Sequence, residues 1–349
     1  MAQIILTDTN LDTFVEQHIG DSSLYHSPAW LELLARLYGY SVIPLVSTNT
    51  SGHITGFLPL CLMQSPLTGR RLVSLPFSDY CTLLAEDESS ANDLINQAIR
   101  LAQEQKVRYL ELRTGVNEAL AKRTDLIEEH LYVRWLLPLC ADPDAVWTKL
   151  RKPVQHQIKK SQKLGVHVRI AQHREEMAHY YRLHLQTRCK KHGMPAQPQA
   201  FFFDLWDTFA AQGTVQLLLA EYQGNVIASM ILFASGTTVR YAYGASDERY
   251  LHLAPNNLLL WTAITWACTH GYETLDLGRT ACDNEGLMEF KRRWGAIKEP
   301  LPYYYYPHTA GLASTSERGW KFRLLTSCWR KLPLQVAGPL GSSLYKHLG

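Results

Sequence analysis

The chain repeats one order of segments twice, and this repetition constrains its fold more than any other feature. Three short matches recur in the same order at nearly one offset, with shifts of 172, 168 and 165 residues. The matched segments are 52–63 with 224–235, 78–80 with 246–248, and 110–113 with 275–278. Because three matches in one order are far more telling than one, the pattern predicts an internal duplication.

Each copy has the pattern of a helix, strands, a second helix and a closing strand. In the first copy, Ser27 and Pro28 fit the start of a helix and Gly39 fits its end. The helix expected at 91–105 has one apolar face, formed by Leu94, Ile95, Ala98, Ile99 and Ala102. We therefore predict an α/β (α+β) fold of two tandem lobes with mixed, mainly antiparallel sheets, and a C-terminal helical tail.

Length and composition agree with this division into parts. The chain has 349 residues, 46% hydrophobic and 19% charged, which is enough apolar material for two cores. We place the first lobe at 1–140, the second with its linker helix at 141–307, and the tail at 308–349. A net charge of +3 does not by itself indicate a nucleic-acid-binding protein.

The seven cysteines form no CxxC pair, so we expect neither a disulfide framework nor a structural zinc site. The first residues lack a basic start and an apolar core, which is not the pattern of a signal peptide. The longest stretch without charged residues, 250–272, contains Pro255, Asn256, Asn257 and His270, and we expect a buried helix there. These features together favour a cytoplasmic protein.

The most informative stretch is 273–296, where a predicted strand at 274–278 is followed by a polar loop and a helix. Arg279, Asp283, Glu285 and Lys291 gather at the carboxyl end of this strand, where α/β sheets usually place their chemistry. The alternative is a solvated loop with a charged helix face. On the helix we expect one apolar face, formed by Leu287, Phe290 and Trp294.

Two basic segments are candidates for anion binding. No acidic residue occurs at 145–174, and this linker carries Lys149, Arg151, Lys152, Lys159, Lys160 and Lys163. It either faces phosphate or tRNA or is a solvated helix. The second segment is the turn 187–193, where Arg188 can hold a phosphate or carboxylate with two bonds and Lys191 and His192 stand beside it.

The C-terminal tail interleaves aromatic and basic residues, including Trp320, Phe322, Trp329 and Arg330. Such a segment either lies on a membrane surface or packs back onto the second lobe. The chain lacks the phosphate-binding, nucleophile-elbow and zinc-helix motifs GxxxxGK[ST], GxGxxG, GxSxG and HExxH. Two similar lobes with a cationic rim favour a transferase whose acyl donor carries phosphates.

Several motifs together resemble the FemAB-like group of GNAT-type N-acyltransferases over about residues 20–307. They are LDLGRT, GLMEFKRRWGA, YAYGAS, TRCKKHGMP, HSPAW, SLPFSDY and LRKPVQHQIKKSQKLG. In this wording the chain is most similar to the exosortase-associated FemAB-related proteins. The resemblance implies tandem GNAT-like lobes that transfer an acyl or aminoacyl group to an amine on a cell-envelope or exopolysaccharide precursor. It implies no tightly bound cofactor, with acyl-CoA or aminoacyl-tRNA as co-substrate.

The resemblance also assigns residues. The FKxxxG motif falls on Phe290 and Lys291, and the family's lysine is thought to stabilise charge at the reacting carbonyl. The family's cleft-facing tyrosines fall on Tyr241 and Tyr243, and its helix-end basic position falls on Arg188. Leu33 and Leu34 stand where Fem ligases often have a lysine, which argues against a UDP-linked muropeptide, and neither half has a glycine-rich pyrophosphate loop.

We therefore expect an acyltransferase in which Lys291 stabilises the oxyanion and Asp283 or Glu285 takes the amine proton, with no metal. Phe290, Arg279, Tyr241, Tyr243, Arg188, Lys191 and His192 are the expected substrate-binding residues. The expected acceptor is a small molecule or glycan precursor. Peripheral membrane contact would come through the tail, at the inner face of the membrane. Two alternatives stay open: a non-catalytic binding module in polysaccharide assembly, and a tRNA-binding factor.

Overall fold

The computed structural model describes residues 9–18, 23–66, 69–307, 326–327 and 329–347, and its chain divides into two compact units. Unit 1 takes the described parts of Met1–Val133, Pro300–Thr315 and His347–Gly349, and unit 2 those of Arg134–Glu299 and Ser316–Lys346. Strands β6 (Ile127–Pro138) and β12 (Ile297–Tyr306) each run through a unit boundary, so both units use parts of them.

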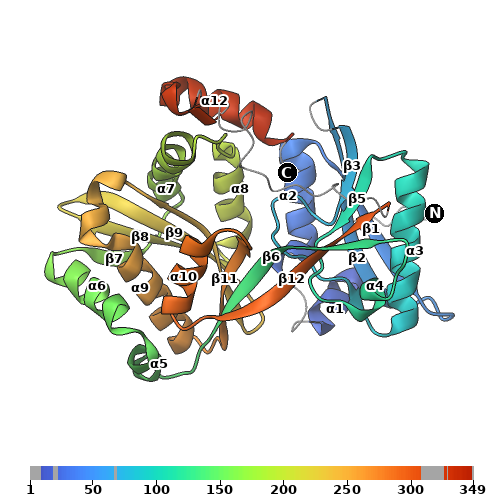
Figure 1. Ribbon diagram of the computed structural model, residues 1–349, viewed down its shortest axis with the longest axis horizontal. Helices are drawn as coiled ribbons and strands as arrows, with labels where there is room; N and C mark the ends of the chain where they lie inside the picture. Colours follow the sequence, from blue (N-terminus) through green and yellow to red (C-terminus); the bar gives the residue numbers. More distant parts are fainter. Residues whose placement is uncertain (1–8, 19–22, 67–68, 308–325, 328, 348–349) are drawn as a thin grey trace. The chain divides into compact units, whose positions relative to one another are not determined.

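Unit 1 is a mixed sheet with helices packed on it (Figure 1). Its other elements are α1 (Thr9–Gln17), η1 (Leu24–His26), α2 (Pro28–Tyr38), β1 (Ser41–Thr48), β2 (Ile54–Ser65), β3 (Gly69–Val73), β4 (Leu84–Ala85), α3 (Glu88–Glu104), β5 (Tyr109–Leu112) and α4 (Glu118–Ala121). The strand order is β1-β2-β3-β5-β12-β6, with β4 beside β2. The five residues expected on the apolar face of α3 all lie in the core of this unit, as predicted.

Local sequence signals set the helix ends of unit 1. The Ser27 hydroxyl accepts a hydrogen bond from the Trp30 N–H, Pro28 begins α2, and Gly39 ends it in the left-handed conformation. All three assignments agree with the prediction. Strand β12 is rich in tyrosine, and its Tyr303 and Tyr305 are buried against other aromatic side chains of unit 1.

Unit 2 is built on the strand order β7-β8-β9-β10-β11-β6. Its strands are β7 (His167–Ile170), β8 (Val215–Tyr222), β9 (Asn225–Ser235), β10 (Thr238–Ser246) and β11 (Thr274–Ala281). Its helices are α5 (Pro143–Lys149), α6 (Lys152–Lys163), η2 (Arg174–Glu176), α7 (Met177–Leu185), η3 (Gln186–His192), α8 (Gln199–Phe209), η4 (Glu248–Leu253), α9 (Pro255–Thr269), α10 (Glu285–Arg293) and α12 (Leu334–Tyr345). Helices α7 and α8 lie on one side of the sheet and α9, with α6 outside it, on the other (Figure 1).

The two units share one strand pattern. In unit 1, β1, β2 and β3 pair antiparallel and β5 then joins β3 in parallel. In unit 2, β8, β9 and β10 pair antiparallel and β11 then joins β10 in parallel. The register places Glu111 opposite Val73 and Asp276 opposite Arg240. The sequence match of 110–113 with 275–278 therefore aligns equivalent strands, and the predicted α/β class with mixed, mainly antiparallel sheets is confirmed.

The linker segment forms α5, α6 and the start of β7, all within unit 2. Strand β6, by contrast, was not among the elements expected from the sequence. Most of the tail lies outside the described residues, but α12 packs on unit 2, as one of the two readings predicted. Among the described residues, no helix has the length and apolar content needed to cross a bilayer.

A buried charge cluster ties three strands of unit 2 together. Asp276 on β11 is 1% exposed, and its Oδ2 accepts from Arg134 of β6 at 3.0 Å and from Arg240 of β10 at 2.9 Å. Its Oδ1 accepts from the Gly278 N–H at 2.7 Å. Because a buried charge is tolerated only when it is paired and hydrogen-bonded, this carboxylate depends on its partners and they depend on it.

We expect Asp276→Ala to lower the free energy of unfolding by about 3–5 kcal/mol, because the buried Arg240 and the partly buried Arg134 would lose their shared carboxylate. Urea unfolding followed by circular dichroism measures the change. Asp207→Ala is the control, since Asp207 pairs with Arg174 at an exposed position and should cost about 0–1 kcal/mol. Equal, small losses in both variants would contradict the prediction.

Candidate functional site

The carboxyl end of β11 and the helix α10 form one connected structure. Asn284 caps α10, with its side-chain oxygen accepting from the Leu287 N–H at 3.1 Å. One turn further, Lys291 is 5% exposed, and its ammonium group donates to the Gly278 carbonyl at 2.9 Å and the Arg279 carbonyl at 3.0 Å. The predicted catalytic lysine is therefore a buried cation held against the end of β11.

The two predicted proton acceptors lie on the surface of the same segment. Asp283 precedes α10 and Glu285 begins it, and both side chains are exposed. A carboxylate in the first turn also interacts favourably with the helix dipole, which is a structural role for Glu285. The structure thus brings Lys291, Asp283 and Glu285 into one strand-loop-helix unit, with the cation buried and the carboxylates open to water.

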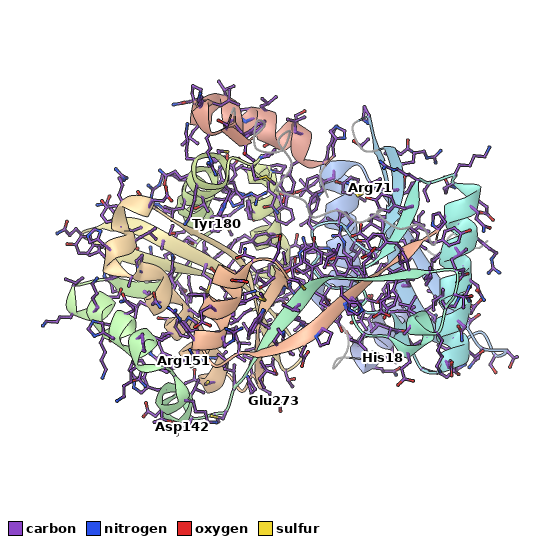
Figure 2. All side chains as sticks on the ribbon, viewed as in Figure 1. His18, Arg71, Asp142, Arg151, Tyr180 and Glu273 are labelled. Atoms are coloured by element: carbon purple, nitrogen blue, oxygen red, sulfur yellow. The ribbon has the colours of Figure 1, made fainter. Side chains whose placement is uncertain are left out.

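The remaining candidates on this segment differ in exposure. Arg279 and Phe290 are half-buried, and the Phe290 ring lies 6.3 Å from the buried Trp294 ring. Leu287, expected on the same apolar face, is instead 38% exposed, so that part of the prediction is wrong. On the surface of α10, Arg293 donates to Glu289 at 3.0 Å. Arg151 at the start of α6 reaches the same carboxylate at 3.4 Å (labelled in Figure 2).

Strand β10 contains an irregularity at the predicted tyrosines. Its antiparallel register with β9 shifts between Tyr241 and Tyr243, so Ala242 is an extra residue in a β-bulge. A Cβ at Gly244 would lie 2.0 Å from the Tyr241 hydroxyl, so only glycine leaves room for this side chain. Burial raises the pKa of Tyr241 to about 12, which keeps its phenol protonated at neutral pH.

Tyr243 belongs to an aromatic cluster that it forms with residues of α8 and β9. Its hydroxyl accepts a hydrogen bond from the Gln197 amide at 3.3 Å. Its ring makes edge contacts with Phe201 and Phe202 of α8 and with Phe233 of β9. Phe201 and Phe202 of α8 are therefore core residues that also orient a predicted site tyrosine.

The predicted cationic turn is a π-helix, η3, which continues directly from α7. Arg188 is half-buried and donates to the Pro195 carbonyl at 3.4 Å, while Lys191 is exposed and lies 4.0 Å from Glu248. Partial burial and the positive charges of Arg188 and Lys191 lower the pKa of His192. The Thr187 hydroxyl bonds the backbone of Ser246, which fixes this turn to the end of β10.

Together these elements place two groups of candidates on neighbouring strands. Strands β10 and β11 pair in parallel at 238–240 and 274–276, and then continue to Ser246 and Ala281. Tyr241 and Tyr243 lie within the first strand, and the cationic turn is bonded to its last residue, Ser246. Lys291 and its carboxylates follow the second strand. The carboxyl ends of parallel neighbours are the usual place for a binding site.

The sequence analysis missed a buried pair in α7. Tyr180 (labelled in Figure 2) and His184 stand one turn apart, and the tyrosine hydroxyl lies 3.2 Å from the histidine Nδ1. Burial, and then the nearby Arg188, lower the pKa of His184 to about 3, and its buried Nε2 has no hydrogen-bond partner within the described part of the chain. The spacing of four residues in an apolar helix was the available signal for this pair.

Two other possible sites can be compared with this one. Among the residues described, no group of three or more His, Cys, Asp or Glu side chains is placed to hold a metal ion. A cavity of about 470 Å³ lies in unit 1, lined by residues of α1 and the β1–β2 hairpin. None of the predicted site residues lines it.

Comparison with known proteins places a domain family on unit 2. Residues 148–292 match the acetyltransferase (GNAT) domain, a segment that contains every predicted site residue. The lipid II:glycine glycyltransferase of Staphylococcus epidermidis is 33% identical over 98 residues, which is 26% of this chain and 24% of that enzyme. Its Staphylococcus aureus counterpart is 32% identical over 91 residues. The chain thus matches about a quarter of the length of these curated relatives.

Solved structures show the fold over most of the chain. The crystal structure of FemX aligns with a TM-score of 0.66 at 17% identity, covering 86% of this chain and 96% of that one. A tandem GNAT protein from the clavulanic acid biosynthesis pathway aligns with a TM-score of 0.53 at 14% identity, covering 89% and 98%. The predicted fold of two tandem GNAT-like lobes is confirmed.

The buried histidine predicts a pH dependence. Its pKa in the folded state lies below the ordinary value of 6.5, so the unfolded chain binds a proton first as the pH falls. We expect the contribution of His184 to stability to be complete above pH 6.5 and to be lost progressively toward pH 3. His184→Phe should flatten the fall in unfolding free energy between pH 6.5 and 4, measured by urea titration at each pH.

The control for this experiment is His179→Phe, an exposed position on the same helix. It should leave the pH slope unchanged. A residual slope is expected in every variant, because burial also lowers the pKa of His26 in unit 1. Identical pH profiles for wild type and His184→Phe would contradict the prediction.

Proposed function

We propose, from the premise that the chain is a FemAB-like member of the GNAT superfamily, that unit 2 catalyses N-acyl transfer. The reaction moves an acyl or aminoacyl group from a phosphate-bearing donor, acyl-CoA or aminoacyl-tRNA, to an amine. The acceptor is an amine on a cell-envelope or exopolysaccharide precursor. The staphylococcal relatives support this class of acceptor, because they are lipid II:glycine glycyltransferases.

The observation that carries the proposal is the buried ammonium group of Lys291 at the carboxyl end of β11. Attack of an amine on a carbonyl develops negative charge on the carbonyl oxygen. A fixed cation shielded from water stabilises that charge more than a solvated one, and it needs no reorganisation during the reaction. The two backbone carbonyls fix the position of the cation before substrate arrives.

The exposed carboxylates supply the second requirement, removal of the amine proton. Asp283 and Glu285 lie on the loop and first turn between Gly278 and Lys291, open to water and to an incoming amine. Either can take the proton directly or through a water molecule. Direct attack requires no covalent intermediate on the protein, and holding amine and carbonyl together supplies roughly 7–11 kcal/mol of the barrier.

Donor binding is assigned to the cations and aromatic groups beside β10. Arg188 and Lys191 suit the phosphates of either donor, and Arg279 stands at the end of the neighbouring strand. Tyr241, Tyr243 and Phe290 offer protonated phenols and ring faces to the acyl portion. His192, whose pKa is lowered, contributes a neutral hydrogen-bonding ring at pH 7.

The matching position in unit 1 supports assigning the reaction to unit 2. The register aligns Arg113 of unit 1 with Gly278 of unit 2. The Arg113 guanidinium donates to the Leu75 and Ser78 carbonyls and to Glu111, and it is buried. A large buried side chain thus stands in unit 1 at the position where unit 2 has a glycine, which favours a single reacting centre.

A second candidate function, tRNA binding without catalysis, rests on the basic helix α6 and the turn before it. Lys149, Arg151, Lys152, Lys159 and Lys163 are exposed, and Val154 and Ile158 are buried, so the charges line the outer face. Titration of purified tRNA at several salt concentrations separates the candidates. Acceptor-independent tRNA binding with steep salt dependence and no transfer would favour the binding factor.

The test of the proposed reaction offers both donor classes to the purified protein. Radiolabelled acyl-CoA and aminoacyl-tRNA are each incubated with an extract of lipid-linked glycan precursors, and the label is followed into an acid-stable amide. Transfer from one donor and not the other identifies the donor. Absence of transfer from both, with native mass spectrometry showing neither donor retained, would contradict the proposal.

We expect Lys291→Met to lower kcat by about 10²–10³-fold, the usual loss for one oxyanion-stabilising donor, with a smaller change in KM. Methionine keeps the length of the stem and removes the charge. Because the ammonium also bonds two carbonyls, thermal unfolding is measured alongside, and Lys291→Arg keeps the charge should the first variant unfold. A folded Lys291→Met protein with wild-type turnover would remove Lys291 from this role.

A further inference from the structure

The helix α12 has an uncharged outer face, which is unusual for a helix on a protein surface. Its twelve residues, Leu334–Tyr345, contain no Asp, Glu, Lys or Arg. Val336 is 49% exposed and Leu340, one turn later, is 43% exposed. Pro339 and Ser343 are exposed on the same side. A surface helix ordinarily carries charged side chains on its outer face. The uncharged outer face of α12, termed the outer stripe, is therefore a candidate docking surface.

The opposite face of α12 is already committed to unit 2. Ala337, Gly338 and Gly341 are buried, and a Cβ at Gly341 would lie 2.9 Å from the Ala196 backbone nitrogen. Figure 1 shows α12 in red beside α7, and Gly338 faces Leu185 at the end of that helix. Only small residues permit this close approach. A rotation of α12 that buried the outer stripe would therefore break the packing of its small residues on unit 2.

The entry to α12 is anchored by a lysine of the cationic turn. The Lys190 ammonium donates to the Arg330 carbonyl at 3.0 Å and to the Leu332 carbonyl at 2.6 Å. A buried cluster of Cys189, Ala196 and Ala337 lies beneath this point. The orientation of the helix is therefore set from its start as well as from its small-residue face.

Positively charged residues lie beyond both ends of α12. Arg330 and Lys331 are exposed before α12, and Lys346 is exposed after it. The sequence from 318 to 349 carries six Lys or Arg residues and no Asp or Glu. An apolar stripe bordered by cations is complementary to an anionic bilayer surface, where the side chains enter the interface and the cations meet lipid headgroups.

We propose that the outer stripe of α12 docks unit 2 onto an anionic lipid bilayer. A bilayer fits better than a second copy of this chain, because a stable dimer needs about 800 Å² from each partner. A helix of this length is roughly 18 Å long and about 10 Å wide, and one face of it offers far less area. The docking is weak and reversible, since two exposed apolar side chains and three described cations carry it.

The inference goes beyond the proposed reaction and does not depend on it. Docking requires neither donor nor acceptor, so it can be tested with no substrate present. Membrane docking would place the GNAT domain near any amine that is carried on a lipid. Failure of the reaction assay would leave this proposal standing, and failure of docking would leave the reaction standing.

The experiment measures co-sedimentation of the full chain with sucrose-loaded vesicles. One set contains equal parts of phosphatidylglycerol and phosphatidylcholine, and the other contains phosphatidylcholine alone. We expect binding to the anionic vesicles, at least tenfold weaker binding to the neutral ones, and release at high salt. The double variant Val336→Asp/Leu340→Asp should lower the affinity for anionic vesicles at least tenfold.

Two controls separate the stripe from general surface properties. Val116→Asp adds a charge at a valine of unit 1 that is 69% exposed, and it should leave vesicle binding unchanged. The triple variant Arg330→Gln/Lys331→Gln/Lys346→Gln should weaken binding and reduce its salt dependence while keeping the stripe. Circular dichroism and thermal unfolding confirm that each variant is folded.

Three outcomes would overturn the proposal. They are absence of binding to anionic vesicles by the wild type, equal binding by the stripe variant, and a concentration-dependent dimer in sedimentation velocity that the stripe variant abolishes. As a second measurement, Val336→Cys labelled with an environment-sensitive fluorophore should shift to the blue on anionic vesicles. An unchanged spectrum would also count against docking.

Discussion

Two buried charges hold one glycine, and unit 2 depends on that arrangement. The N–H of Gly278 donates to Asp276, and the carbonyl of the same residue accepts from Lys291. Gly278 has a φ of +75°, a conformation that other residues rarely adopt. The carboxylate and the ammonium therefore fix both backbone groups of this residue, three positions before β11 ends at Ala281.

The duplicated strand in unit 1 shows how the same frame has been used differently. Glu111 occupies the position of Asp276, but Val73 stands where unit 2 has Arg240. The cation that neutralises the buried acid comes from the same strand, as Arg113, which is the position of Gly278. That arginine also donates to the Leu75 and Ser78 carbonyls, so its role in unit 1 is structural. The two copies therefore differ in where the arginine that pairs with the buried acid stands. In unit 2 it is Arg240 on the neighbouring strand, and in unit 1 it is Arg113 at the end of the acid's own strand.

Much of the fold could be predicted from the sequence because it rests on local signals. The cap at Ser27, the stop at Gly39 and the apolar face of α3 follow from residues close in the chain. The repeat also predicted that the two copies share one sequence of helices and strands. Strand β6 was missed because its middle mixes charged and apolar residues without clear alternation, and its partners lie far away in sequence. The exposure of Leu287 likewise depends on tertiary neighbours, which periodicity does not contain.

The sequence proposes the candidate site as a list of residues, but it does not contain the contacts that each residue makes in the fold. Lys291 was proposed for its charge, yet its backbone acceptors could not be read from spacing. The cationic turn is clearer still, because three neighbouring cations of similar chemistry have three different partners. Arg188 meets the Pro195 carbonyl, Lys190 anchors the entry to α12, and Lys191 faces Glu248.

That division of partners gives the turn a structural task as well as a chemical one. Thr187 fixes it to the end of β10, where Tyr241 and Tyr243 lie, and Lys190 fixes it to the helix that carries the outer stripe. The wider π-helical turn spaces these contacts so that adjacent residues can reach separate elements. A displacement of α12 would therefore act on η3 and, through Thr187 and Ser246, on the carboxyl end of β10. The turn that the sequence predicted as an anion site therefore also contacts both the entry to α12 and the end of β10.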